Sequence, residues 1–258
     1  MMDRPGEAIS AAIRRAAARG QPALVGFMTA GFPKRATFSR DLAAICASAD
    51  VVEIGIPFTD PMADGMTIQH ASQAALQDGF TLPWLFDELD RMQPRPAAPL
   101  LLMSYLNPLL AFGFESLAER APSAGIAGFI IPDLPYEESG EIRSTLAHAG
   151  LGVVQLVTPV TPLDRTRMLC EASAGFVYAV TMTGTTGRSV SVPDSVLEYM
   201  DRVRDVSPVP VCAGFGIRSA EQVSRMRGHV DGVVVGSALV EVLERGEDPA
   251  EFLRSLRD

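Results

Sequence analysis

The chain has 258 residues, of which 47% are hydrophobic and 21% are charged, so it is long enough to bury a substantial core. Its 22 basic and 31 acidic side chains give a net charge of −9 at neutral pH. This charge disfavours binding to nucleic acids or anionic membranes, because phosphate-rich surfaces attract clustered Lys and Arg. No apolar run approaches the roughly 18 residues of a membrane-spanning helix, so we expect no membrane segment.

Lysine and histidine are scarce, which limits the chemistry that the side chains can perform. Lys34 is the only lysine, and we expect it on the surface because it follows a proline near the start of a helix. The three histidines lack the spacing of metal ligands; they are His70, His148 and His229. Reactions that need a lysine Schiff base or a histidine metal cluster therefore have few candidate residues.

The three cysteines lie far apart and form no CxxC pair; they are Cys46, Cys170 and Cys212. This pattern predicts reduced thiols in a cytosolic protein rather than a disulfide framework or a zinc site. The N-terminal segment has no apolar core of a secretory signal, and Asp3 and Glu7 disfavour a transit peptide. We therefore expect a cytoplasmic protein.

Taken in chain order, short apolar runs alternate with longer segments of helical periodicity. The apolar runs predict strands at Ala23–Met28, Val51–Ile54, Leu100–Tyr105, Gly128–Ile131, Val153–Val157, Phe176–Val180, Val209–Cys212 and Gly232–Val235. The helical segments are Ala36–Ser48, Ile68–Leu76, Pro83–Met92, Phe114–Arg120, Glu137–Ala147, Asp164–Ala172, Asp194–Val206, Ser219–Met226 and Ser237–Arg245. Two extra helices are predicted outside this alternation, at Pro5–Arg19 and Pro249–Asp258.

Most of the predicted strands are apolar on both faces, which is typical of a parallel sheet that is covered on both sides. The strand–helix alternation predicts an α/β fold with right-handed crossovers. Eight such units in a chain of this length match a (β/α)8 TIM barrel. A doubly wound open sheet is the alternative, which the strand count does not exclude. Because no linker interrupts the alternation, we expect residues 1–258 to form a single domain.

The densest group of polar residues follows the second predicted strand, within residues 52–69 (VEIGIPFTDPMADGMTIQ). Glu53 interrupts an apolar strand, and burying a carboxylate there is costly unless it is paired or used. Asp60 and Asp64 lie in the loop that follows. Glu53 and Asp64 could face one substrate and provide a general acid and base. A salt-bridged Glu53 and an ordinary turn at Asp60 explain the same residues equally well.

Glycines follow the last three predicted strands, within Thr183–Gly187, at Gly214–Gly216 and at Gly236-Ser237. Glycine lets the backbone approach an anion closely, and the start of a helix offers unpaired N–H groups. TIM barrels frequently bind phosphate with the loops after strands seven and eight. The succession of these glycines favours a phosphate site over simple turns. By contrast, no P-loop or GxGxxG motif follows the first strand.

Two apolar features have both a structural and a functional interpretation. Tyr178 lies within the sixth predicted strand, where core packing explains it as well as a role in a site does. The apolar segment Leu106–Phe112 is expected to be a loop that folds onto the barrel rim or forms a contact surface for a partner protein.

These motifs together resemble the tryptophan synthase α-subunit family along nearly the whole chain. The segments that carry the resemblance are Phe27–Pro33, Val52–Gln69, Asn107-Pro108, Asp133–Pro135, Gly184–Gly187, Gly214–Ile217 and Gly236-Ser237. The resemblance implies a (β/α)8 barrel that cleaves indole-3-glycerol phosphate into indole and D-glyceraldehyde 3-phosphate. It also implies that this chain needs no cofactor, and that a partner β subunit carries pyridoxal phosphate in an αββα complex.

The resemblance also implies roles for individual residues. Glu53 matches the acid–base residue that protonates indole C3 and takes the proton from the glycerol hydroxyl. Asp64 matches the carboxylate that binds the indole N–H and stabilises the cation. The phosphate-binding positions are Gly187, Gly216, Gly236 and Ser237. The substrate-binding positions are Phe27, Met103, Tyr178 and Phe215.

The chain departs from the family pattern at Met66, where proline is usual, and in the segments Thr181–Thr183 and Arg188–Ser191 of the loop after the sixth strand. Two alternatives to a subunit of a complex therefore stay open. One is a stand-alone lyase that uses the same site without a β subunit, and the other is a weakly catalytic subunit that activates a partner. Indole-forming synthases on similar barrels use a lysine acid, and none of the predicted strands contains a lysine.

Overall fold

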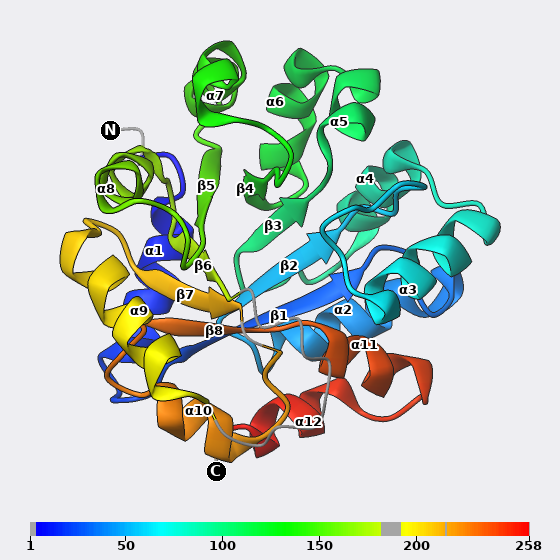
Figure 1. The fold of residues 1–258 in the computed structure, drawn as a ribbon. Coiled ribbons are helices and arrows are strands. Elements are labelled where there is room, and N and C mark those ends of the chain that lie inside the picture. The colour runs from blue at the N-terminus through cyan, green and yellow to red at the C-terminus, as the bar shows by residue number, and fades with distance from the viewer. Residues whose placement is uncertain (1–3, 182–191, 215, 258) are drawn as a thin grey trace.

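Eight parallel strands close into a barrel in sequence order, with helices around it (Figure 1). The computed structural model describes residues 4–181, 192–214 and 216–257. The strands are β1 (Ala23–Thr29), β2 (Val51–Gly55), β3 (Leu100–Met103), β4 (Ile126–Ile130), β5 (Gly152–Val157), β6 (Val177–Val180), β7 (Val211–Gly214) and β8 (Gly232–Val235). Because β8 pairs with β1, the barrel prediction is confirmed and the open-sheet alternative is wrong.

The helices follow the strands and cover the outside of the barrel, as Figure 1 shows. They are α1 (Glu7–Ala17), η1 (Arg35–Thr37), α2 (Phe38–Cys46), α3 (Met66–Gln77), α4 (Leu82–Arg91), α5 (Leu106–Phe112), α6 (Phe114–Ser123), η2 (Tyr136–Glu138), α7 (Gly140–His148), α8 (Leu163–Ala172), α9 (Asp194–Val206), α10 (Ala220–Met226), α11 (Ser237–Glu244) and α12 (Pro249–Ser255). In the described part of the chain, no helix is long and apolar enough to cross a membrane.

The segment Leu106–Phe112 forms helix α5, so the prediction of a loop there is wrong. Its proline, Pro108, lies in the first turn, where the N–H that proline lacks would have no helical partner. Leu109 is fully buried on the inner side of this helix, whereas Leu110 is 54% exposed.

Each strand contributes apolar side chains to two separate layers. Side chains that point into the barrel form one cluster, which includes Val25, Val51, Leu101, Ile130, Val154, Phe176, Cys212 and Val234. Alternate residues such as Leu24 and Leu102 point outwards and pack against the helices in a second, larger cluster. This arrangement explains why the strand sequences are apolar on both faces.

Helix α1 closes the N-terminal end of the barrel. Ile9 and Ile13 are fully buried and belong to the same cluster as the barrel interior. The turn before the helix packs closely against the residues just before β6. A Cβ atom on Gly6 would lie only 2.7 Å from the backbone nitrogen of Gly175, which shows how near the two backbones are. Ser10 Oγ donates a hydrogen bond of 2.5 Å to the carbonyl oxygen of Gly175. Helix α1 therefore blocks the entry of a ligand from the N-terminal end of the barrel.

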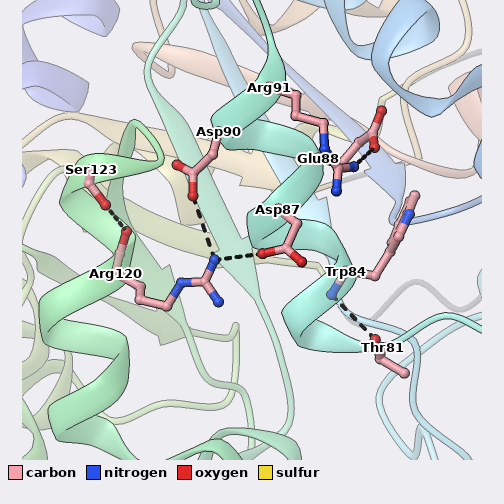
Figure 2. A network of polar contacts seen from close by, with 8 residues as sticks. All are labelled: Thr81, Trp84, Asp87, Glu88, Asp90, Arg91, Arg120 and Ser123. Carbon is pink, nitrogen blue, oxygen red and sulfur yellow. Dashed lines mark hydrogen bonds and ion pairs between the residues drawn. The ribbon is translucent and has the colours of Figure 1, made fainter.

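A polar network joins α4 to α6 on the outside of the barrel (Figure 2). The Arg120 guanidinium on α6 donates to Asp87 Oδ1 at 2.9 Å and lies 3.5 Å from Asp90 Oδ2 on α4. The same guanidinium carbon lies 5.0 Å from the ring centroid of Phe86. Arg120 thus stacks on an aromatic ring and binds two carboxylates. These contacts hold together α4 and α6, the helices on either side of β3.

The closure by α1 leads to a prediction about stability. Replacing Ile13 by Ala should lower the free energy of unfolding by about 2–5 kcal/mol, because the cavity left in the packed barrel cannot collapse fully. Chemical denaturation measures this change. As a control, Val160→Ala should change the free energy by less than about 0.5 kcal/mol, since Val160 is 75% exposed. Equal effects of the two substitutions would contradict the packing described for α1.

Candidate active site

Glu53 lies inside the barrel near the C-terminal ends of the strands. It is level with Phe27 of β1 and Leu101 of β3, and its side chain is 1% exposed. Its Oε2 atom has no hydrogen-bond partner among the described residues. Burial and, to a smaller extent, the nearby charge of Asp64 together raise the pKa of Glu53 to about 8. Among the described residues no arginine forms an ion pair with Glu53, and the charge that acts on it is that of a carboxylate, which disfavours the salt-bridge interpretation.

Asp64 lies in the loop between β2 and α3 and is partly buried. Burial raises the pKa of Asp64 to about 6, while a hydrogen bond with the Tyr105 hydroxyl acts in the opposite direction. The N–H of Ala63 donates to the same hydroxyl at 2.8 Å. Tyr105 therefore ties the loop to the end of β3. Asp60 is exposed and accepts a hydrogen bond of 2.5 Å from Thr59 Oγ1, which fits its interpretation as a turn residue.

Tyr105 is a site residue that the sequence pattern does not single out. It is 5% exposed, and its ring lies 5.3 Å from the ring of Phe58 in the loop that also holds Asp64. The sequence feature that could have identified Tyr105 is its position two residues after β3, because side chains that follow parallel strands gather at one end of a barrel.

Tyr178 lies in β6 with its ring against β7. A Cβ atom on Gly214 would lie 2.5 Å from Tyr178 Cε1, so only glycine leaves room for this ring. Burial raises the pKa of the Tyr178 hydroxyl well above its usual value, and the charge of Glu53 acts in the same direction. Tyr178 is half-buried and lies near enough to Glu53 for the charge of Glu53 to act on its hydroxyl, and its role in the site stays a prediction.

Apolar side chains form a wall beside Glu53. Phe27 is 3% exposed, and its ring covers Gly55, where a Cβ atom would lie 2.5 Å from Phe27 Cζ. Met103 ends β3 and packs against both apolar clusters. Phe215, which the family resemblance implies for the same pocket, lies outside the described residues. The arrangement places apolar side chains next to a carboxyl group whose pKa of about 8 keeps it protonated at neutral pH.

The predicted phosphate positions lie at the ends of β7 and β8. Gly216 follows β7 with a φ of 74°, a left-handed conformation that favours glycine. Gly236 precedes α11, and Ser237 is the first residue of that helix. The first N–H groups of α11 have no partner within the helix and can bind an anion. Gly187 lies outside the described residues.

Metal-ligand and thiol chemistry have little support in the described part of the chain. Within residues 4–181, 192–214 and 216–257, no cluster of His, Cys, Asp or Glu could hold a metal ion. The cysteines are buried and unpaired, as predicted. Burial raises the pKa of the Cys46 thiol to about 12, so it is an inert apolar group at neutral pH. Lys34 is exposed, as predicted.

The burial of Glu53 predicts how stability depends on pH. Its pKa is about 8 in the folded protein against an ordinary value of 4.5, so the folded state holds a proton that the unfolded state releases. The free energy of unfolding should therefore fall as the pH rises from about 5 to 8, by up to about 4 kcal/mol. Glu53→Gln should remove most of this fall in denaturation curves between pH 6 and 8. The exposed Glu115→Gln should keep it, and an unchanged slope in Glu53→Gln would contradict the assignment.

Known proteins resemble this chain in sequence and in structure. The profile of a family described as tryptophan synthase alpha chain matches residues 13–256. The tryptophan synthase alpha chain of Nitratidesulfovibrio vulgaris is 43% identical over 244 residues, which cover 94% of this chain and 95% of the relative. The one from Solidesulfovibrio magneticus is 44% identical over 95% of this chain and 96% of its own.

Solved structures agree with the sequence relatives. A tryptophan synthase chain from Mycobacterium tuberculosis has a TM-score of 0.87 and 31% identity, with 97% of this chain and 98% of that chain covered. The tryptophan synthase A-subunit from Pyrococcus furiosus has a TM-score of 0.83 and 32% identity, over 92% and 98% of the two chains. The chain therefore belongs to the tryptophan synthase alpha chain family, the lyases that cleave indole-3-glycerol phosphate.

Proposed function

We propose that Glu53 and Asp64 cleave indole-3-glycerol phosphate into indole and D-glyceraldehyde 3-phosphate in this chain. The observation that carries the proposal is the buried carboxyl group of Glu53, whose Oε2 atom has no partner among the described residues and whose pKa is near 8. A group with this pKa holds its proton at neutral pH and can still release it to a substrate. The apolar wall formed by Phe27 and Met103 beside it fits an indole ring.

Glu53 serves first as the acid and then as the base. Indole leaves poorly until its C3 atom is protonated, and the Glu53 carboxyl group supplies this proton. The resulting Glu53 carboxylate takes the proton from the glycerol hydroxyl next to the bond that breaks. The electron pair of that O–H bond forms the aldehyde, and the carbon–carbon bonding pair returns to the indole ring. Glu53 thereby regains its proton at the end of the cycle.

Asp64 stabilises the positive charge that protonation places on the ring. Its pKa of about 6 leaves it largely ionised at neutral pH, and the Tyr105 hydroxyl fixes its position. A fixed carboxylate close to the indole N–H lowers the energy of the cation without the cost of reorganising solvent. Tyr178 completes the pocket on the side of β6.

The phosphate group of the substrate would bind at the ends of β7 and β8. Gly216, Gly236 and Ser237 provide backbone N–H groups there, with Gly187 as a further position implied by the family. Phe215 would close the indole pocket from the loop after β7. Binding the phosphate at one end and the ring at the other holds the scissile bond next to Glu53.

We further propose that the chain works with a β subunit that carries pyridoxal phosphate, in a cytoplasmic αββα complex. Exposed apolar side chains on the helices and loops after β2 and β3 support a partner surface beside the site. Met62 and Met66 are 88% and 78% exposed, and Leu110 on α5 is 54% exposed. Apolar side chains exposed in this way are typical of protein contacts. The buried free thiols fit a reducing compartment.

Two substitutions test the proposed residues. Glu53→Gln should lower indole release by about 10²–10⁴-fold because the proton donor is lost. Asp64→Asn should lower it by about 10²–10³-fold because the cation loses its counter-charge. Indole formation from indole-3-glycerol phosphate is measured with and without a tryptophan synthase β subunit, with the exposed Asp164→Asn as a control that keeps wild-type rates.

The outcomes of this assay separate the proposals. Near-wild-type turnover by both site variants would contradict the mechanism. Strong activation by the β subunit supports the complex, whereas high activity of the chain alone supports a stand-alone lyase. Absence of indole formation under both conditions would contradict a catalytic function.

The pKa values also predict the pH dependence of the reaction. Activity requires Glu53 protonated and Asp64 ionised, so the rate should fall above about pH 8 and below about pH 6. Steady-state indole release between pH 5 and 9 should therefore follow a bell-shaped curve. A flat profile over this range would contradict the assigned protonation states.

A further inference from the structure

A second cavity lies outside the barrel interior, where β4 and β5 separate. The two strands pair only from Gly128 and Gly152 to Ile130 and Val154. Beyond this point β5 continues beside β6 as far as Val157, whereas β4 ends at Ile130. The gap leaves a cavity of about 240 Å³. One ordered water needs only about 10–15 Å³ of such volume, so the cavity can hold a small organic molecule.

The inner wall of this cavity carries the side-chain amide of Gln155. Gln155 lies between Val154 and Leu156, which point into the barrel, so its side chain points outwards to the cavity. Gln155 is 8% exposed, and its side-chain amide has no hydrogen-bond partner among the described residues. The polar atoms of this amide are not fully buried, so they reach the cavity, where hydrogen bonds with water can be exchanged for hydrogen bonds with a ligand.

The other walls are mostly apolar, and the charges at the rim neutralise each other. Leu134, Tyr136 and Leu169 line the cavity beside Gln155. At the rim, the Arg165 guanidinium binds the Glu137 carboxylate through two hydrogen bonds of 2.6 and 3.1 Å. Because each charge is taken up by the other, the cavity selects neither an anion nor a cation. The fitting ligand is a neutral molecule with an apolar ring and one N–H or O–H group.

We infer that the β4–β5 cavity is a second binding site for a small neutral aromatic molecule, which Gln155 recognises through its side-chain amide. Indole has this chemistry, since its ring is flat and apolar and it carries a single N–H donor for Gln155 Oε1. The choice of indole as the ligand rests on the proposed function, because indole is the product of that reaction. Leu156 faces the barrel beside Tyr178, so β5 forms the wall between the two sites.

The experiment locates 5-bromoindole in crystals of the full chain by the anomalous signal of bromine, and measures the affinity for indole in solution by calorimetric titration. The expected result is bromine density in the β4–β5 cavity of the wild type and of Glu53→Gln. Gln155→Leu has nearly the same volume but no amide, so it should bind indole at this site about tenfold more weakly. 1-Methylindole, which lacks the N–H donor, should bind the wild type as weakly as indole binds Gln155→Leu.

Several outcomes would overturn the inference. These are bromine density in the barrel interior alone, equal affinity of wild type and Gln155→Leu, or binding seen in crystals and absent in solution. Because binding is measured without turnover, the inference and the proposed function fail separately. Loss of indole release with bromine still in the cavity contradicts the reaction alone, whereas normal indole release by a wild type with an empty cavity contradicts the second site alone.

Discussion

The burial of the Glu53 carboxyl group inside a closed barrel is the constraint on which the rest of the site depends. Glu53 is 1% exposed, and no described residue bonds to its Oε2 atom. The fold accepts the residue because the carboxyl group keeps its proton, with a pKa near 8. An apolar environment thereby makes an ordinary side chain a proton donor at neutral pH.

The structure fixes this acid and its charged neighbour by different means. Glu53 lies on a strand that is hydrogen-bonded on both sides, whereas Asp64 lies on a loop that Tyr105 anchors to β3. Glycines then give space to the aromatic side chains that enclose Glu53. Gly55 makes room for Phe27, and Gly214 makes room for Tyr178, so a methyl group at either glycine would displace a wall of the pocket.

The barrel could be predicted from the sequence because its strands are apolar on both faces and alternate regularly with helices. Boundaries were harder to predict, and β7 runs from Val211 to Gly214 instead of Val209 to Cys212. Pro210 cannot donate to a strand ladder, so the strand begins after it, and Gly214 is retained because it pairs with Val180. Hydrophobicity alone does not reveal either effect.

The carboxylates of the site could be found from the sequence because a charged residue stands out in an apolar strand. The contacts that tune them could not, since they join residues far apart in the chain. Tyr105 is an unremarkable residue after an apolar run until the fold brings it to Asp64. The space that Gly55 and Gly214 leave is likewise visible only when the rings of Phe27 and Tyr178 are placed against them.

Glu53 and Gln155 show why a carboxyl group suits catalysis and an amide suits recognition. Both are buried residues on strands of the same barrel. Glu53 faces inwards with an Oε2 atom that has no partner among the described residues, and Gln155 faces outwards with an amide that reaches a cavity. Burial raises the pKa of the carboxyl group, so the group keeps a proton that it can transfer. An amide does not titrate near neutral pH, so it offers the same donor and acceptor atoms to a bound molecule over the whole neutral range. The carboxyl group therefore suits proton transfer in the barrel, and the amide suits ligand binding beside it.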